Sequence, residues 1–244
     1  MTAKQESTGG DRRPTGTASS VVLPPGFRSR LLEGLTASEI RAVLAAARHQ
    51  KISPNEVLQH EGDPAKHLYL LLTGLAAFYK ATPEGSKLFL RWIAPGDAFG
   101  LATLQLTQQP YFVTIQAQRE GSLLVWDRVS AQALASQILQ LRKNASAIAG
   151  NFVASLADAL AARASQTAQQ RLARVLVESA RHIGRNGREC IELDLTNEQL
   201  AQMADVSLFT ASRQLNEWQS QGILAKGRKK IVLRAPQRLS SERF

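Results

Sequence analysis

The stretch LTNEQLAQMADVSLFTASRQLNEWQSQGIL, residues 195–224, holds side chains that can bind nucleic acid, and it holds them at helical spacing. Arg213 can donate two hydrogen bonds to the O6 and N7 atoms of a guanine, which specifies that base. The hydroxyl and amide groups around it are of the kind that contact phosphates. Leu208 and Phe209 precede Arg213 in the same stretch, and their side chains carry no polar group. They either contact thymine methyl groups or pack against the protein's own scaffold.

Two short helices joined by a tight turn are needed to position these side chains. Thr196 and Gln199 predict a capping box at the start of the first helix, and Ser207 predicts the cap of the second. Asp205 lies between them, where the turn favours a left-handed residue and Asp is tolerated. The pattern predicts a helix-turn-helix. Its inward-facing residues are Leu200, Met203, Ala204, Ala211, Leu215 and Trp218.

The segment ILAKGRKKIVLRAP follows, and it reads as two apolar strands around a basic turn from Lys226 to Lys230. Such a hairpin is the wing of a winged helix, and its cations are expected to meet phosphates beside the groove. The alternative is an ordinary helical subdomain with a hairpin. The candidate DNA-binding residues are Thr196, Ser207, Leu208, Phe209, Thr210, Ser212, Arg213, Asn216, Lys226, Arg228, Lys229 and Lys230.

The distribution of charge agrees with a nucleic-acid partner for the C-terminal third. The net charge is +10, and residues 168–244 carry thirteen Lys and Arg against eight Asp and Glu. Such an excess favours an anionic partner. Cys190 is the single cysteine, so one chain forms neither a disulfide framework nor a cysteine-rich metal site. The first residues lack the apolar region of a signal peptide, and no apolar run is long enough to span a bilayer. We therefore expect a cytoplasmic protein without a membrane partner.

The first half of the chain predicts a domain of many short strands. After a helix predicted over residues 31–49, with a capping box at Thr36 and Glu39, Gly and Pro separate a series of apolar runs. This pattern indicates an antiparallel sandwich or jelly roll that closes near Asp127. The runs are EVLQH, HLYLLL, LAAFYK, KLFLRWI, YFVTIQAQ and SLLVWD.

From residue 131 the apolar period becomes helical. A helix there places small and apolar residues at alternating steps of four and three, which predicts a seam between two helices. The seam is either a dimer interface or a face that packs on the protein's own sheet. A second helix follows, AQQRLARVLVESARHI, with one apolar face. The candidate interface residues are Ala145, Ala149, Phe152, Leu156 and Ala159.

The predicted fold class is therefore α+β. The prediction divides the chain into a disordered tail (residues 1–24), a jelly-roll sensor domain (25–130), a dimerisation helix region (131–166) and a winged helix-turn-helix domain (167–244). Residues 1–20 show no apolar periodicity and are rich in Gly, Ser and Thr, which is typical of a disordered segment.

This order of parts resembles the Crp/Fnr family of bacterial transcription regulators over roughly residues 25–235. The resemblance is carried by EGDPAKHLYLLLTG, PGDAFG and the stretch at residues 195–224. It implies a homodimer that binds double-stranded DNA at a two-fold symmetric site and recruits or blocks RNA polymerase. The family's recognition helix usually carries Glu and Arg four residues apart. Arg213 matches the Arg, whereas Phe209 stands at the position of the Glu.

The sensor half departs from members that bind cyclic AMP. Those members hold the ribose with a Glu after the GD-x-x-G turn and the phosphate with an Arg-Ser pair. Here Leu101 follows the turn, and the pair falls on Tyr111 and Phe112. Leu156 lies in the helix region that would contact the base. These residues define a predicted effector pocket, and no cyclic AMP response is expected because an unpaired phosphate is costly to bury.

Other effectors stay open at this point. A haem is one of them, with His49, His60, His67 and His182 as candidate ligands, and the single cysteine excludes the four-cysteine iron–sulfur cluster of oxygen-sensing members. An apolar small effector, oxidation of Cys190 and the absence of any effector are the others. Two further classes compete with a regulator: a cupin-like enzyme, whose converging His ligands the sequence does not offer, and a sensor that acts without DNA. We expect no resident cofactor or metal and no enzymatic activity.

Overall fold

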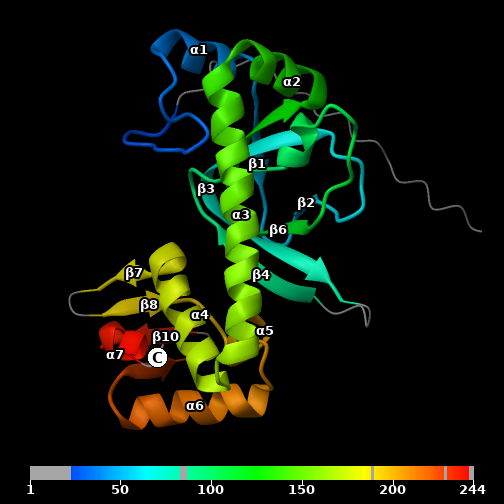
Figure 1. Cartoon of the computed structure of the whole chain (residues 1–244). Coiled ribbons are helices and arrows are strands. Elements are labelled where there is room, and N and C mark those ends of the chain that lie inside the picture. The colour runs from blue at the N-terminus through cyan, green and yellow to red at the C-terminus, as the bar shows by residue number, and fades with distance from the viewer. Residues whose placement is uncertain (1–22, 83–86, 188–189, 228–229, 242–244) are drawn as a thin grey trace, which may run out of the picture.

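The computed structural model describes residues 23–82, 87–187, 190–227 and 230–241. All but the last two residues of the predicted N-terminal tail lie outside this range. Figure 1 shows the sheet of the N-terminal part above a smaller C-terminal part, with the long helix α3 (Leu139–Ser165) running past both. Each part combines helices with an antiparallel sheet. The α+β prediction is therefore confirmed.

The N-terminal part, here called the sheet domain, is built on one antiparallel sheet in the order β1-β6-β3-β4. Strand β2 adds to β6, and β5 adds to β3. Two helices close its upper end in Figure 1. Its elements are α1 (Ala37–Ala45), β1 (Arg48–Ile52), β2 (Val57–Gln59), β3 (His67–Ala81), β4 (Lys87–Ile93), β5 (Ala98–Phe99), η1 (Leu101–Leu104), β6 (Thr114–Asp127) and α2 (Arg128–Gln137).

Strands β3 and β6 bend together where Gly74 meets Gly121. Gly74 has a φ of 90°, and a Cβ atom there would lie 2.7 Å from the backbone oxygen of Glu120. A Cβ atom at Gly121 would lie 2.1 Å from the backbone oxygen of Thr73. Only glycine lets the two backbones approach this closely. The predicted breaks at these glycines are therefore wrong, because each glycine lies inside one long strand and not between two short ones.

The predicted helix over residues 31–49 is also longer than the observed one. The capping box at Thr36 and Glu39 is confirmed, and α1 begins directly after it. The helix ends at Ala45, however, and His49 lies in β1, opposite Leu124 of β6. Pairing with a distant strand prevails here over the local helical pattern.

The start of α3 is fixed to the sheet domain. Leu141 and Ala145 are buried in the same apolar cluster as Leu31 and Trp126. The Asn144 side-chain amide donates to the backbone oxygens of Leu31 at 3.0 Å and of Glu33 at 2.7 Å. These contacts fix the direction in which α3 leaves the sheet.

The C-terminal part, here called the reader domain, combines three helices with a four-stranded antiparallel sheet in the order β7-β8-β10-β9, and a short last helix follows. Leu172, Val175, Leu176 and Ile183 of the predicted apolar face of α4 are buried, as expected, while Ala180 is partly buried. The elements are α4 (Ala168–Ile183), β7 (Arg185–Asn186), β8 (Ile191–Leu193), α5 (Asn197–Ala204), α6 (Leu208–Ser220), β9 (Leu224–Gly227), β10 (Lys230–Leu233) and α7 (Pro236–Ser241).

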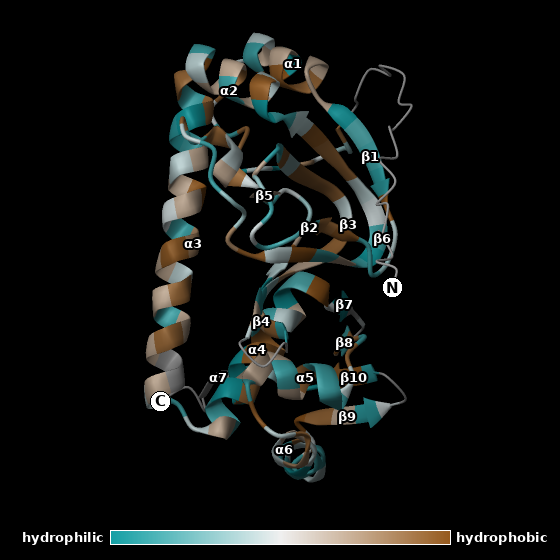
Figure 2. Ribbon diagram, turned by 90° about the vertical axis from the view of Figure 1, so that its right-hand side faces the viewer, coloured by the Kyte–Doolittle hydropathy of each residue, from teal (hydrophilic) through white to brown (hydrophobic). Residues whose placement is uncertain are grey.

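The two domains share one apolar cluster. Leu75, Ala77 and Trp92 of β3 and β4 belong to the same buried cluster as the core of the reader domain. Figure 2 shows β4 descending onto α4, and β4 contacts both α4 and α5. The indole Nε1 of Trp92 donates to the Ser179 hydroxyl at 3.2 Å, and both groups are buried. This contact ties the reader domain to the end of the β3–β4 pair.

Ser179→Ala is expected to lower the free energy of unfolding by about 1–3 kcal/mol, because it leaves the buried Trp92 N–H without its acceptor. Urea unfolding followed by circular dichroism measures this change. Ser155→Ala, on an exposed part of α3, is the matched control and is expected to change the free energy by less than about 0.5 kcal/mol. Equal stabilities of the two variants would contradict the role assigned to the Trp92–Ser179 bond.

Candidate nucleic-acid interface and ligand cavity

Helices α5 and α6 are joined by the turn that the sequence predicts. Asp205 has φ 53° and ψ 55°, so it occupies the left-handed region and ends α5. The capping box at Thr196 and Gln199 is present at the start of α5, and the Ser207 hydroxyl accepts from the Thr210 N–H at 3.1 Å at the start of α6. These local contacts fix the angle between the two helices.

Helix α6 buries one face and exposes the other. Ala211, Leu215 and Trp218 are fully buried, as predicted, and Gln214 lies beside them. Arg213 and Asn216 lie on the exposed face. A helix held on one side by a core and open on the other is the arrangement by which a recognition helix enters a major groove.

Leu208 and Phe209 are exposed at the start of α6. The exposed fraction is 46% for Leu208 and 77% for Phe209. The alternative in which Phe209 packs on its own scaffold is therefore wrong. Two adjacent apolar side chains left in water at a helix start are available to a partner, and thymine methyl groups are apolar contacts of the right kind.

The cations near α6 differ in what they contact. The Lys226 ammonium donates to the side-chain oxygen of Asn216. The Lys230 ammonium lies 2.5 Å from the Glu192 carboxylate of β8. Arg228 and Lys229, at the tip of the predicted wing, lie outside the described residues.

The predicted hydroxyl contacts are partly engaged within the protein. The hydroxyls of Ser207 and Thr210 lie 2.9 Å apart, and the Ser212 hydroxyl accepts from the Asn197 amide at 3.3 Å. Phosphate contacts from these groups would have to share or replace those bonds, so they remain predictions.

Arg171 is a residue that the sequence analysis did not single out. Its guanidinium donates to the backbone oxygens of Ala204 at 3.0 Å and of Asp205 at 3.2 Å, and also to that of Gln166 at 3.0 Å. It thereby holds the turn of the helix-turn-helix against α4. The signal for this role is its place in the first turn of a buried amphipathic helix, but the two partners in the turn, Ala204 and Asp205, are over thirty residues away.

A cavity of about 390 Å³ lies between the sheet domain and α3. Leu101, Tyr111 and Phe112 of the predicted effector pocket line it. Leu156 does not, because it lies one helical turn beyond Phe152, which closes that end by stacking on Phe78 at 5.0 Å. Three other residues of the predicted seam, Ala145, Ala149 and Phe152, line it, together with Arg142, Ser146, Ile148 and Val153 of the same helix.

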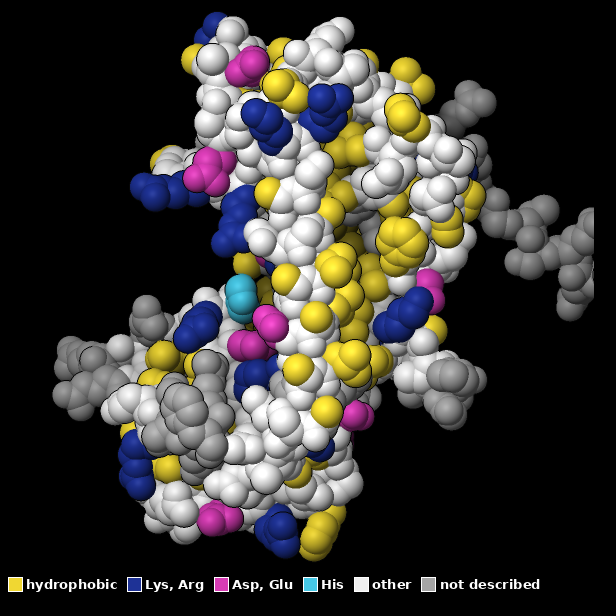
Figure 3. All heavy atoms as spheres, in the orientation of Figure 1, with side chains coloured by type: hydrophobic (Ala, Val, Ile, Leu, Met, Phe, Trp, Pro, Cys, Tyr) yellow, Lys and Arg dark blue, Asp and Glu magenta, His cyan; other side chains and the backbone are white. Residues whose placement is uncertain are grey.

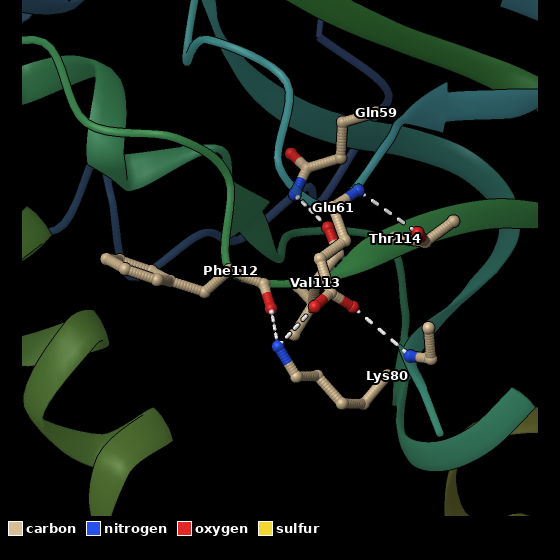
Figure 4. Close-up of polar contacts among 7 residues, drawn as sticks. Gln59, Glu61, Lys80, Phe112, Val113 and Thr114 are labelled. Carbon is tan, nitrogen blue, oxygen red and sulfur yellow. Dashed lines mark hydrogen bonds and ion pairs between the residues drawn. The ribbon is translucent and has the colours of Figure 1, made fainter. Parts of the chain in front are cut away.

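The cavity wall around Tyr111 and Phe112 is fixed by polar contacts. The Tyr111 hydroxyl accepts from the backbone N–H of His67 and donates to its backbone oxygen, each at 2.9 Å. Lys80 donates to the backbone oxygen of Phe112 at 3.1 Å and to Glu61 (Figure 4). Hydrogen bonds from Lys80 and from a backbone N–H hold the pKa of Glu61 below its usual value. Burial raises the pKa of Tyr69 and lowers that of His67.

The predicted seam on α3 faces the protein's own sheet domain at two positions. Ala145 is buried in the cluster below α1 and α2, and Phe152 packs on Phe78. Within one chain the alternative of packing on the own sheet therefore applies to these two residues, and the dimer assignment of the seam stays a prediction. Ala149 lines the cavity, while Leu156 and Ala159 are partly buried. Figure 3 shows hydrophobic side chains along the outer surface of α3 and in the hollow beside it.

The remaining candidates for an effector site are scattered. None of His49, His60, His67 and His182 is among the residues that line the cavity. Across the described ranges, no group of three or more His, Cys, Asp or Glu side chains has an arrangement that could hold a metal ion. Cys190 is a free, partly buried thiol just before β8.

No helix in the part of the chain that the structure describes has the length and apolarity to cross a membrane.

Two family models match separate parts of the chain. The model of the cyclic nucleotide-binding domain matches residues 49–138, and that of the Crp-like helix-turn-helix domain matches residues 170–242. The first range covers β1 to α2, together with most of the cavity wall. The second begins within α4 and includes the recognition helix.

Characterised relatives span most of the chain. The anaerobic regulatory protein of Pasteurella multocida is 23% identical over 188 residues, which are 76% of this chain and 68% of the relative. The CRP-like cAMP-activated global transcriptional regulator of Mycobacterium tuberculosis is 20% identical over 215 residues, 87% of this chain and 96% of the relative. The structure of FixK2 from Bradyrhizobium japonicum has a TM-score of 0.69 at 26% identity, covering 80% of this chain and 96% of that one.

Arg213→Ala is expected to lower affinity for the preferred DNA sequence by about 1–3 kcal/mol and to relax preference at one base-pair position, because a bidentate base contact is lost. Selection of bound sequences from a random pool, followed by titration, measures both effects. Arg41→Ala removes the same charge from α1 of the sheet domain and is expected to leave the selected sequence unchanged. An unaltered motif for Arg213→Ala would contradict the placement of α6 in the major groove.

Proposed function

The chain belongs to the Crp/Fnr family of transcription regulators, and from that premise we propose that it acts as a homodimer on two-fold symmetric DNA sites without responding to cyclic AMP. Its helix-turn-helix makes it a DNA-binding regulator and not an enzyme. Our proposal consists of four statements: the protein is a homodimer, its DNA site is symmetric, it acts on RNA polymerase, and it does not respond to cyclic AMP.

One observation carries the proposal: α6 has a buried face and an exposed face that combines Arg213 with Leu208 and Phe209. Arginine can distinguish guanine, and the apolar pair can contact thymine methyls. A surface of this composition reads base edges, whereas an electrostatic surface alone would bind any sequence.

The exposed side of α3 supports a dimer. Gly150, Val153, Ala157, Leu160 and Ala164 follow one another at steps of three and four, and the exposed fraction is 64% for Val153 and 70% for Leu160. This row is distinct from the predicted seam, which faces the sheet domain at Ala145 and Phe152. We propose that it is the seam between two copies of α3.

Gly150 gives independent support for this row. A glycine in a helix interior costs about 0.5–1 kcal/mol relative to alanine. A Cβ atom at Gly150 would meet no atom within 4 Å in a single copy of the chain, so nothing in one protomer requires a glycine there. Close approach of a second helix would require it.

A dimer through α3 relates two recognition helices by a two-fold axis, and their target then consists of two inverted half-sites. We propose that binding to such sites recruits or blocks RNA polymerase, as the family resemblance implies. Dimerisation also raises affinity, because the second α6 binds at a high effective concentration once the first is bound.

The aromatic pair at Tyr111 and Phe112 supports the missing cyclic AMP response. Tyr111 is buried and its hydroxyl is bonded to the His67 backbone, so it offers no free donor for a phosphate. Phe112 places a ring at the neighbouring position. A phosphate held there would face two aromatic side chains and would gain no free cation from this segment, because Lys80 is bonded to Glu61 and to the Phe112 backbone.

Leu160→Glu is expected to convert the dimer to a monomer and to weaken binding to a symmetric site by about 100-fold or more, because it places like charges in the seam and removes the bivalent contact. Sedimentation at micromolar protein and a DNA titration measure the two effects. Asn151→Glu, about 200° around the helix from Val153 and also exposed, is the matched control and is expected to stay dimeric.

A dimeric Leu160→Glu variant would overturn the proposed seam. Selection of sequences by the wild-type protein that lack inverted repeats would overturn the symmetric site, whatever the state of α3.

Cyclic AMP is expected to show no binding heat at micromolar concentration and to leave DNA affinity unchanged, since the residues at the phosphate position are aromatic. Titration calorimetry and a DNA shift assay with and without the nucleotide measure this. The cAMP-activated relative from Mycobacterium tuberculosis, treated in parallel, is the positive control. Micromolar binding accompanied by a gain in DNA affinity would refute this part of the proposal.

A further inference from the structure

One side-chain contact joins the wing to the recognition helix. The Lys226 ammonium of β9 donates to the side-chain oxygen Oδ1 of Asn216 in α6. A lysine ammonium has donors and no acceptor, so only the oxygen of the amide can face it. A bond from a charged donor is also stronger than a bond between neutral groups. The contact therefore determines which atom of the Asn216 amide is engaged within the protein.

The backbone around the two residues fixes this contact. Gly222, with a φ of 72°, turns the chain back just after the end of α6. The Ile223 N–H donates to the Trp218 backbone oxygen at 2.9 Å, and both side chains are buried. Strand β9 consequently lies beside α6 (Figure 2), and Lys226 is paired with Ile231 of β10. The wing thus holds Lys226 in place from both sides.

Asn216 lies on the same side of α6 as Arg213, and both residues are exposed. A helix rises about 1.5 Å and turns about 100° per residue, so Asn216 lies about 4.5 Å along the axis and about 60° around it from Arg213. Successive bases of one DNA strand are about 3.4 Å apart along the duplex. When Arg213 contacts a guanine, Asn216 therefore comes next to the edge of a neighbouring base pair.

The exposed carboxylate of α6 is bonded on the other side of Arg213. Glu217 accepts from the Gln214 side-chain amide at 3.3 Å. Gln214 lies about 100° around the helix from Arg213, in the direction opposite to Asn216. The carboxylate is thus engaged away from Asn216, whereas the Lys226 ammonium is bonded to Asn216 itself.

The engaged oxygen changes the base that an asparagine recognises. Asparagine usually reads adenine with both ends of its amide, because the oxygen accepts from the N6 amino group and the nitrogen donates to N7. At Asn216 the adenine amino group would have to approach an oxygen that already accepts from an ammonium. The amide nitrogen carries two donors. Guanine, with O6 and N7, and thymine, with O4, offer acceptors in the major groove and no amino group there.

We propose that Asn216 is a specificity-determining residue, that Lys226 is its positioning residue, and that the pair selects guanine or thymine over adenine at the base pair next to the one read by Arg213. This inference deepens the proposed function and rests on it. The opposing hypothesis is that Lys226 leaves Asn216 on binding and neutralises a phosphate. A phosphate contact carries no sequence information, so base preference distinguishes the two.

Selection of bound sequences from a random pool, followed by titration of single-base variants of the selected site, tests the proposal on the full-length protein. Asn216→Ala is expected to abolish the preference at one base-pair position and to keep the guanine that Arg213 reads. At that position we expect the wild-type protein to bind adenine about 10-fold more weakly than guanine or thymine, which is within the discrimination of one base contact.

Lys226→Met keeps the length of the side chain and removes its ammonium. It is expected to raise the affinity for adenine at the Asn216 position by about 10-fold or more relative to guanine and thymine, because Oδ1 can then accept from the adenine amino group. In the Asn216→Ala background the same change is expected to alter no base preference. Lys230→Met is the matched control, because the Lys230 ammonium is paired with Glu192 of β8, and it is expected to keep the selected sequence.

The proposal is overturned if the wild-type protein prefers adenine at this position, if Asn216→Ala changes no position, or if Lys226→Met leaves the base preference unchanged, as loss of a phosphate contact does. Arg213→Ala, selected in parallel, separates this outcome from failure of the proposed function. A sequence preference that depends on Arg213 but not on Asn216 refutes this inference alone. A wild-type protein that selects no sequence refutes the proposed function and this inference with it.

Discussion

The burial of Trp92 between the two domains fixes the position of the recognition helix relative to the sheet domain. Its ring belongs to the apolar cluster of the reader domain, and its N–H is bonded to Ser179 of α4. A buried indole with a bonded N–H tolerates little displacement, because both the packing and the hydrogen bond are lost together. An ion pair between Arg119 of β6 and Asp194, with nitrogen and oxygen 3.6 Å apart, lies between the same two domains.

The same two strands form a wall of the cavity. Along β3, Leu75 and Ala77 face the reader domain, whereas Ala76 and Phe78 belong to the core beside the cavity. Along β4, Trp92 faces the reader domain and its neighbour Arg91 lines the cavity. Successive residues of a strand point to opposite faces, so one layer of backbone separates the cavity from the reader domain. The side chains on one face of this layer therefore line the cavity or its core, and those on the other face pack against the reader domain.

The sequence predicted the features that depend on neighbours a few residues apart. The caps at Thr36, Thr196 and Ser207, the left-handed Asp205 and the buried face of α6 all follow from contacts within one or two helical turns. Features set by distant contacts were missed or misplaced. Strand β1 exists because it pairs with β6, and Arg171 gains its role from carbonyl oxygens more than thirty residues away.

Helix α3 shows why periodicity alone could not assign a face. It carries two rows of small and apolar residues at heptad-like spacing, one through Phe152 and one through Val153. Either row satisfies the pattern of a helix seam. The choice is made by Phe78, whose ring stacks on Phe152 and so turns the other row outward. That partner lies more than seventy residues earlier, in a strand whose inward and outward faces depend on the register with β6.

The aromatic pair at Tyr111 and Phe112 changes the chemistry of the cavity without abolishing the cavity. The Tyr111 side chain points inward, and its hydroxyl forms both of its hydrogen bonds with the His67 backbone. These bonds stabilise the protein itself, so the hydroxyl is not free to bind a ligand. Phe112 turns outward, and its backbone carbonyl takes the Lys80 ammonium. The Lys80 ammonium, the positive charge near this segment, is thereby bonded to the protein's own backbone and to Glu61. Among the described residues that line the cavity, Arg142 on α3 is the cation without an ion pair.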